Sequence, residues 1–77
     1  MSEEQILKSF GRKLHCLRVS LKLSQEQLAE RAQLDRTYVS SVERGKQNVS
    51  LLNICKLADA LKVAPGSLLA DLGEDNE

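Results

Sequence analysis

The chain is poor in aromatic residues and proline. Among its 77 residues there is no Trp, one Phe (Phe10), one Tyr (Tyr38) and one Pro (Pro65). Because β-branched residues are also sparse and Leu is plentiful, the composition favours helices over strands. A chain of this length forms one small domain with a modest core. We therefore expect association of two copies to add stability.

The sequence also lacks clustered metal ligands and catalytic groups. Its two cysteines, Cys16 and Cys55, are far apart, no CxxC pair is present, and His15 is its only histidine. This pattern predicts no metal site and no cofactor, with both thiols reduced and packed inside helices. No nucleophile–base set, carboxylate pair or phosphate loop is present, which argues against an enzyme. No leader or membrane-length apolar run is visible, so we expect a cytoplasmic protein that does not contact membrane.

The net charge of zero conceals an uneven distribution. Residues 1–49 carry nine basic and six acidic side chains, a surplus of three positive charges. Residues 50–77 carry two basic and five acidic side chains, a surplus of three negative charges. The first part of the chain can therefore present a basic face, although the charge distribution taken alone favours an ordinary solvated mixed surface.

Helix start signals recur along the chain. Each of four polar residues stands where an N-cap is expected, ahead of apolar residues at helical spacing: Ser2, Ser24, Asp35 and Ser50. Ser2 with Gln5 and Ser24 with Gln27 form capping-box patterns. The signals predict a first helix over about 3–21, three further helices, and a short fifth helix opened by Pro65. The fold class is therefore all-α, with residues 1–72 as one five-helix domain and 73–77 as an acidic flexible tail.

The second and third helices are joined by a very short link. Only Gln33 and Leu34 separate the apolar part of the second helix from Asp35, the N-cap of the third. So short a link forces the two helices to cross steeply, and the third helix then projects from the domain. This is the geometry of a helix-turn-helix, whose second helix can enter the major groove of DNA.

The third helix has an unusual outer face. If Val39 and Val42 face inward, the outward residues near its start are small, polar or basic: Arg36, Thr37, Ser40 and Ser41. Thr, Tyr, Val and Ser are poor helix formers, so this sequence is not explained by helix stability. Arg can bond guanine bidentately, and Ser and Thr hydroxyls can bond base edges. The pattern predicts a DNA-contacting face.

The stretch LSQEQLAERAQLDRTYVSSVERGKQNVSLLNICKLADAL resembles the Cro and phage-repressor (XRE) helix-turn-helix family. The resemblance covers about residues 10–69. Within that family, LDRTY followed by SSVERG is most similar to the controller proteins of restriction–modification systems, which are small dimeric autoregulators. Those proteins commonly carry Arg immediately before the Asn of this segment, whereas this chain has Gln47 before Asn48. One phosphate contact of the family is therefore expected to be missing.

The resemblance implies roles for particular residues. Arg36 and Thr37 match base-contacting positions, with Ser40 and Ser41 behind them. Tyr38 matches a position that contacts a base or a phosphate, but it can equally cover the edge of the core. The positions that resemble contacts to the DNA backbone are Gln25, Arg44, Lys46, Gln47 and Asn48. Arg18 and Glu43 resemble an ion pair that ties the first helix to the third.

The fourth helix carries more apolar residues than one buried face requires. Leu51, Ile54, Leu57, Ala58 and Leu61 already form a core face. The surplus apolar residues there and in the fifth helix predict a dimer interface: Leu52, Cys55, Val63, Pro65 and Leu69. A two-fold dimer predicts a pseudo-palindromic operator.

The sequence therefore predicts a dimeric regulator that binds double-stranded DNA at an operator. Such a protein acts by blocking or recruiting RNA polymerase, and the resemblance implies autoregulation of a restriction–modification system. The alternative is an antitoxin or other phage-type repressor that acts through a protein partner. Only about five residues follow the last predicted helix, which leaves little chain to bind such a partner.

Overall fold

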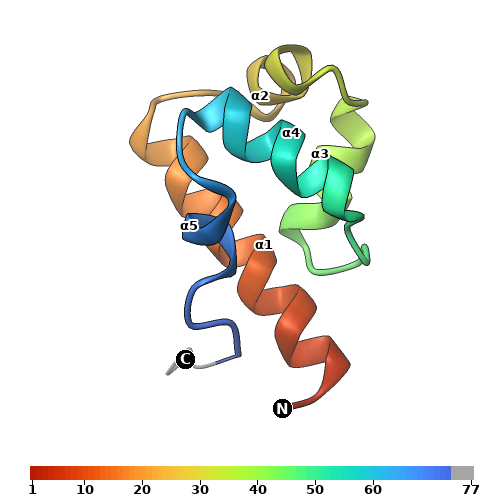
Figure 1. Ribbon diagram of the computed structural model, residues 1–77. Coiled ribbons are helices and arrows are strands. Elements are labelled where there is room, and N and C mark those ends of the chain that lie inside the picture. Colours follow the sequence, from red (N-terminus) through yellow and green to blue (C-terminus); the bar gives the residue numbers. More distant parts are fainter. Residues whose placement is uncertain (74–77) are drawn as a thin grey trace.

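The computed structural model describes residues 1–73, and within them the chain is all-helical (Figure 1). Five α-helices follow in order: α1 Glu3–Ser20, α2 Gln25–Ala32, α3 Arg36–Glu43, α4 Leu51–Leu61 and α5 Pro65–Leu69. The predicted all-α, five-helix architecture is confirmed. Most of the acidic tail predicted over 73–77 lies outside the described residues. Gly73 is described, and its backbone N–H donates to Ser9 Oγ of α1 at 3.0 Å.

Side-chain caps explain where the helices begin. At α1 the Ser2 hydroxyl accepts from the Gln5 N–H at 3.1 Å, and the Gln5 amide oxygen accepts from the Ser2 N–H at 2.8 Å. Ser24 and Gln27 form the same reciprocal pair at α2, with distances of 3.0 and 2.8 Å. Each pair satisfies two backbone donors that a helix start leaves without partners. The helix starts could therefore be predicted closely from the sequence.

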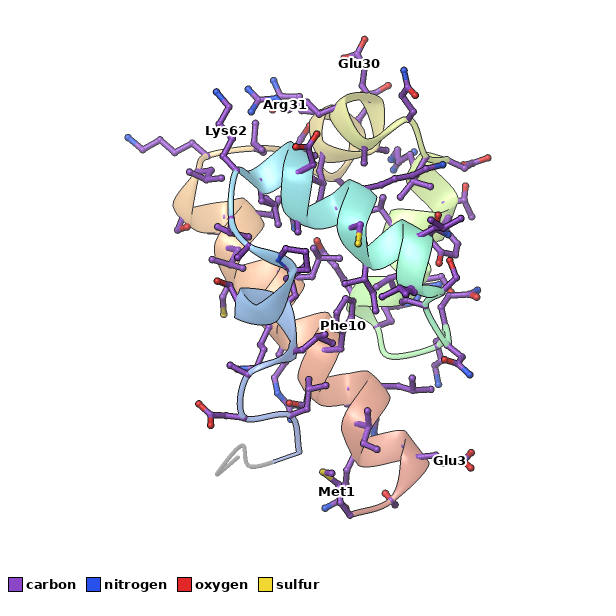
Figure 2. All side chains as sticks on the ribbon, viewed as in Figure 1. Met1, Glu3, Phe10, Glu30, Arg31 and Lys62 are labelled. Carbon is purple, nitrogen blue, oxygen red and sulfur yellow. The ribbon has the colours of Figure 1, made fainter. Side chains whose placement is uncertain are left out.

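One apolar core joins all five helices. α1 packs against α3 and α5, while α2 packs against α3 and α4. Figure 2 shows Phe10 directed from α1 toward the middle of the molecule. Its neighbours in the core come from every helix and include the fully buried Leu14, Leu28, Val39, Leu57 and Leu68. Because α3 contributes to this core, its orientation is fixed by the rest of the domain.

Both cysteines are exposed, contrary to the prediction that they would be packed inside. Cys16 lies two residues after the fully buried Leu14, and Cys55 lies two residues before the fully buried Leu57. Two residues correspond to about 200° around a helix, so each thiol lies on the side opposite its buried neighbour. The helical pattern was correct, but small apolar side chains occur on either side of such a helix.

The predicted core face of α4 is wrong at its first residue. Leu51 is 71% exposed, whereas Leu57, Ala58 and Leu61 are buried as expected. Leu51 belongs to the first turn of α4, and burial along this helix begins with the half-buried Asn53 and Ile54. The beginning of α4 therefore presents Leu51 together with Leu52 to solvent.

Gly11 brings α1 unusually close to the end of α3. A Cβ atom at this position would lie 2.6 Å from the carbonyl oxygens of both Val42 and Glu43. Such a distance is far shorter than van der Waals contact, so only glycine allows the two helix backbones to approach this closely. This contact was not predicted, although a glycine inside a helical pattern is a signal of close packing.

Candidate nucleic-acid interface

The turn between α2 and α3 is tight. Gln33 adopts a left-handed conformation (φ 58°, ψ 44°) and ends α2. The N–H of Leu34 then donates to the carbonyl of Ala29 at 2.9 Å, and the half-buried Leu34 packs against the core. Asp35 caps α3 by accepting from the Thr37 N–H at 2.8 Å. These contacts hold α2 and α3 as a helix-turn-helix unit.

α3 has a buried side and an accessible side, as the sequence predicts. Val39 and Val42 are almost completely buried. Arg36 and Thr37, at the start of the helix, are exposed. The three hydroxyl residues that follow on the accessible side are half-buried: Tyr38, Ser40 and Ser41. Arg36, Thr37, Ser40 and Ser41 therefore lie on the accessible part of α3, whereas Tyr38 also packs against the core, as the alternative interpretation of this residue expected.

The ion pair between Arg18 and Glu43 connects α1 to the end of α3. Arg18 Nε donates to Glu43 Oε2 at 2.6 Å, and Arg18 Nη2 donates to Glu43 Oε1 at 3.0 Å. The remaining guanidinium nitrogen, Nη1, donates to the carbonyl of Leu23 at 2.7 Å. Bidentate Arg–carboxylate geometry is specific as well as strong. The pair fixes the end of α3 relative to α1 and to the loop before α2.

The Glu43 carboxylate receives two further hydrogen-bond partners. Gln25 Nε2 donates to Glu43 Oε1 at 3.1 Å, and His15 Nδ1 lies 3.1 Å from the same oxygen. Burial alone would raise the pKa of Glu43. Hydrogen bonds from Arg18, Gln25 and His15, with the charge of Arg18, instead hold that pKa below its ordinary value. Conversely, the hydrogen bond to Glu43 raises the pKa of Arg18.

Gln25 combines an implied contact with the DNA backbone and an observed hydrogen bond to Glu43. The family resemblance implies that Gln25 contacts the DNA backbone, and it lies at the first position of α2. In the structure its amide nitrogen is directed to Glu43, and the residue is half-buried. Gln25 therefore joins α2 to the end of α3, and its contact with a phosphate remains a prediction.

Each of the three half-buried hydroxyls on α3 accepts a hydrogen bond from another side chain. Arg44 Nη1 donates to Ser40 Oγ at 2.7 Å, and Gln47 Nε2 donates to Ser41 Oγ at 3.1 Å. Asn53 Nδ2, from α4, donates to the Tyr38 hydroxyl at 3.1 Å. Two predicted backbone-contacting residues, Arg44 and Gln47, therefore touch the accessible side of α3. Asn53 was not predicted, because nothing local in the sequence points to a partner fifteen residues away.

Residues 17–68 match the helix-turn-helix family. The match spans more than half of the chain and includes all of α2, α3 and α4. The chain belongs to the helix-turn-helix family. The matched residues include the helix-turn-helix unit described above.

Relatives of this helix-turn-helix protein include restriction–modification controllers. The chain is 51% identical to the control protein C.BamHI of Bacillus amyloliquefaciens over 61 residues, covering 78% of this chain and 75% of that protein. It is 45% identical to the control protein C.MunI of Mycoplasma sp over 67 residues, covering 86% and 90% of the two chains. Among solved structures, the controller protein C.AhdI of Aeromonas hydrophila superposes with a TM-score of 0.80 at 55% identity, covering 80% of this chain and 94% of that one. The chain is accordingly a helix-turn-helix DNA-binding regulator of the controller type.

The apolar residues predicted to form a dimer interface lie on α4, on α5 and in the link between them, and one of them, Val63, packs against the core. Leu52 is 74% exposed and Leu69 is 40% exposed. Cys55 and Pro65 are also exposed, while Val63 is half-buried. These five residues, with the exposed Leu51, are called the α4–α5 patch below. Exposed apolar side chains in one region of a small domain indicate an interaction surface.

The remaining predicted DNA-backbone residues, Lys46 and Asn48, are exposed in the segment that joins α3 to α4. Gly45 precedes them in a left-handed conformation (φ 74°), which is common for a glycine just past a helix end. In residues 1–73 no helix is long and apolar enough to cross a membrane. The same residues contain no group of three or more His, Cys, Asp or Glu side chains that could hold a metal ion.

Proposed function

We propose that this protein is a homodimeric regulator that places α3 in the major groove of a pseudo-palindromic operator. The observation that carries the proposal is the accessible side of α3. It presents the exposed Arg36 and Thr37 beside three half-buried hydroxyls, on a helix held in place by buried Val39 and Val42. In helix-turn-helix proteins the start of the second helix contacts base edges. We therefore assign base contacts to Arg36, Thr37, Tyr38, Ser40 and Ser41.

We assign contacts with the DNA backbone to residues that flank this side of α3. Gln25 opens α2, and the other four follow α3: Arg44, Lys46, Gln47 and Asn48. Cations near phosphates supply most of the non-specific affinity for DNA and make it depend on salt. The surplus of three positive charges in residues 1–49 is consistent with this assignment.

The α4–α5 patch is the proposed dimer interface. A two-fold dimer presents two α3 helices to successive major grooves, about 34 Å apart along the DNA. The controller relatives suggest that the regulated genes are those of a restriction–modification system, including the gene for this protein. Such regulation acts by blocking or recruiting RNA polymerase. Because a DNA-binding regulator must share a compartment with its operator, we place the protein in the cytoplasm.

The first test is selection of bound duplexes from a random pool by the full chain, at near-physiological salt, followed by sequencing. We expect enrichment of an inverted repeat whose half-sites are about one helical turn apart. Lack of any enriched sequence, with a protein that is folded by circular dichroism, would contradict the proposal. An enriched sequence without two-fold symmetry would contradict the dimeric arrangement but not DNA binding.

A further inference from the structure

Three hydroxyl groups on the accessible side of α3 share one hydrogen-bonding pattern. Tyr38, Ser40 and Ser41 each accept a hydrogen bond from a nitrogen of a side chain outside α3. The three donors come from three places: Asn53 from α4, Arg44 from the C-cap of α3, and Gln47 from the segment after it. The side chain that contacts each of these hydroxyls is thus a hydrogen-bond donor, although the three donors are of different residue types.

A hydroxyl has one hydrogen to donate and two lone pairs that accept. In residues 1–73 none of these three hydroxyls donates to another protein group. Because one lone pair of each oxygen accepts from a protein donor, the hydrogen and one lone pair remain for a group that approaches from outside, and the accepted hydrogen bond strengthens the hydroxyl as a donor. Arg36, at the start of the same face, has only donors to offer.

We propose that the accessible side of α3 is a polarised set of hydrogen-bond donors, which selects operator half-sites that present acceptors to it. The proposal rests on the DNA-binding face proposed above and names the chemistry that this face selects. In the major groove the acceptors are guanine O6 and N7, adenine N7 and thymine O4. The exocyclic amino groups of cytosine and adenine are donors, and they are disfavoured opposite Tyr38, Ser40 and Ser41.

Asn53 is the positioning residue that makes this proposal testable. Its side chain holds the Tyr38 hydroxyl, while its own backbone N–H donates to Ser50 Oγ at 3.2 Å in the cap of α4. Asn53→Asp keeps the shape of the side chain but replaces the amide nitrogen with an acceptor. The Tyr38 hydroxyl then donates inward, and its hydrogen is lost to DNA. The substitution suits the fold, because a carboxylate in the first turn of a helix is favourable.

The experiment measures Kd by fluorescence anisotropy for the full chain, on the selected operator duplex and on a scrambled duplex of equal length. The variants are Tyr38→Phe, Asn53→Asp, Asn53→Ala and the double variant Tyr38→Phe with Asn53→Asp. The Kd for the scrambled duplex divided by the Kd for the operator measures sequence preference. This ratio cancels the non-specific repulsion between the added carboxylate and phosphates. We expect Tyr38→Phe and Asn53→Asp each to lower this ratio by about 2- to 10-fold, the value of one hydrogen bond.

The double variant and the alanine variant make the result specific. The double variant is expected to lose no more than Tyr38→Phe alone, because both changes remove the same donated hydrogen. Asn53→Ala leaves the hydroxyl able to donate, so its loss is expected to be smaller than that of Asn53→Asp. Three outcomes would each overturn the proposal. The double variant could lose the sum of the two single losses, the two Asn53 variants could lose equally, or Tyr38→Phe could leave the ratio unchanged.

A second pair repeats the test at another hydroxyl. Gln47→Glu should reverse the hydrogen bond at Ser41, and its effect should vanish in the Ser41→Ala background. This pair decides the question if a variant at Asn53 fails to fold. The outcome is separable from that of the proposed function. Loss of all sequence preference in the unchanged protein would contradict operator binding, whereas operator binding with additive variants would contradict only the donor assignment.

Discussion

Arg18 and Glu43 form a bidentate ion pair across 25 positions of sequence, with Arg18 Nε 2.6 Å from Glu43 Oε2. The Glu43 side chain is 5% exposed and that of Arg18 is 11% exposed. Gln25 and His15 bind the same carboxylate. Two helices, α1 and α2, thus converge on the last residue of α3, which is the helix assigned to DNA. The pair specifies where that helix ends relative to α1 and α2, whatever its net contribution to stability.

Glu43→Ala is expected to destabilise the domain by about 3 kcal/mol or more, because it leaves a largely buried guanidinium without its counter-charge. Urea unfolding followed by circular dichroism measures this change. Glu30→Ala is the matched control, since Glu30 is exposed on α2 and a surface substitution changes stability by about 0.5 kcal/mol or less. Equal midpoints for the two variants would refute a structural role for the ion pair.

The stability that Glu43 contributes should depend on acid pH. Because its pKa is lower in the folded protein than in the unfolded chain, unfolding takes up a proton as the pH falls. The contribution is therefore complete above the unfolded-state pKa, about 4.3, and it is lost as the pH falls through the folded-state pKa. Urea unfolding between pH 7 and pH 3 should show that the stability difference between the natural protein and Glu43→Gln narrows toward pH 3. A difference that stays constant or widens would contradict the assignment.

Gly11→Ala should destabilise the protein even though alanine is the better helix former. Its Cβ would lie 2.6 Å from two backbone oxygens of α3, so the helices would have to move apart, at a cost of about 1–3 kcal/mol. Gly66→Ala is the control, because no heavy atom lies within 4 Å of a Cβ at that position of α5. Thermal unfolding should show a lower Tm for the first variant and an equal or slightly higher Tm for the second. Similar Tm values for both would show that α1 and α3 are not closely packed.

The parts of the fold that could be predicted from sequence are those set by local chemistry. Ser24 with Gln27 and Asp35 mark the helix starts, because a capping side chain lies within three residues of the N–H it satisfies. Burial of small apolar residues could not be predicted equally well. Cys16 and Cys55 occur within helical patterns, but their direction depends on which other helices surround α1 and α4.

The contacts that the sequence analysis missed are all tertiary. Asn53 meets Tyr38 only because the fold brings the start of α4 near α3, although α4 packs mainly against α2 and α5, and His15 meets Glu43 only because α1 packs against α3. No periodicity or short motif encodes such distant pairs. The face of α3 itself was predictable, because Val39 and Val42 define the buried side and helical spacing then places Thr37 and Ser41 on the other.

Arg36 and Lys46 should differ in how their loss affects DNA binding. Arg36→Ala is expected to weaken binding to the selected operator by about 1–3 kcal/mol and to relax preference at one base pair in each half-site. Lys46→Ala should weaken binding to operator and scrambled duplexes alike and reduce the salt dependence by about one ion. Anisotropy titrations at several salt concentrations measure both effects. A loss from Arg36→Ala that is equal on the two duplexes would refute its contact with a base.

The dimer interface can be tested with two exposed leucines. Leu52, 74% exposed in the α4–α5 patch, should become buried in the dimer, whereas Leu21, 47% exposed after α1, should remain in solvent. Each copy contributes its own Leu52 to a two-fold interface, so Leu52→Ser removes two buried leucine side chains from the dimer. This substitution is expected to raise the dimer dissociation constant by about 100-fold. Leu21→Ser should leave that constant unchanged. Sedimentation equilibrium measures both.

The two variants also separate dimerisation from folding, because each removes the same apolar side chain from an exposed position of the single domain. Circular dichroism at a concentration where both are monomeric should then give similar spectra. Unchanged association of Leu52→Ser would remove the α4–α5 patch from the interface, and a natural protein that is monomeric at tens of micromolar would contradict the dimer itself. In the second case the operator should reduce to a single half-site, since a pseudo-palindrome requires two copies of α3 related by a two-fold axis.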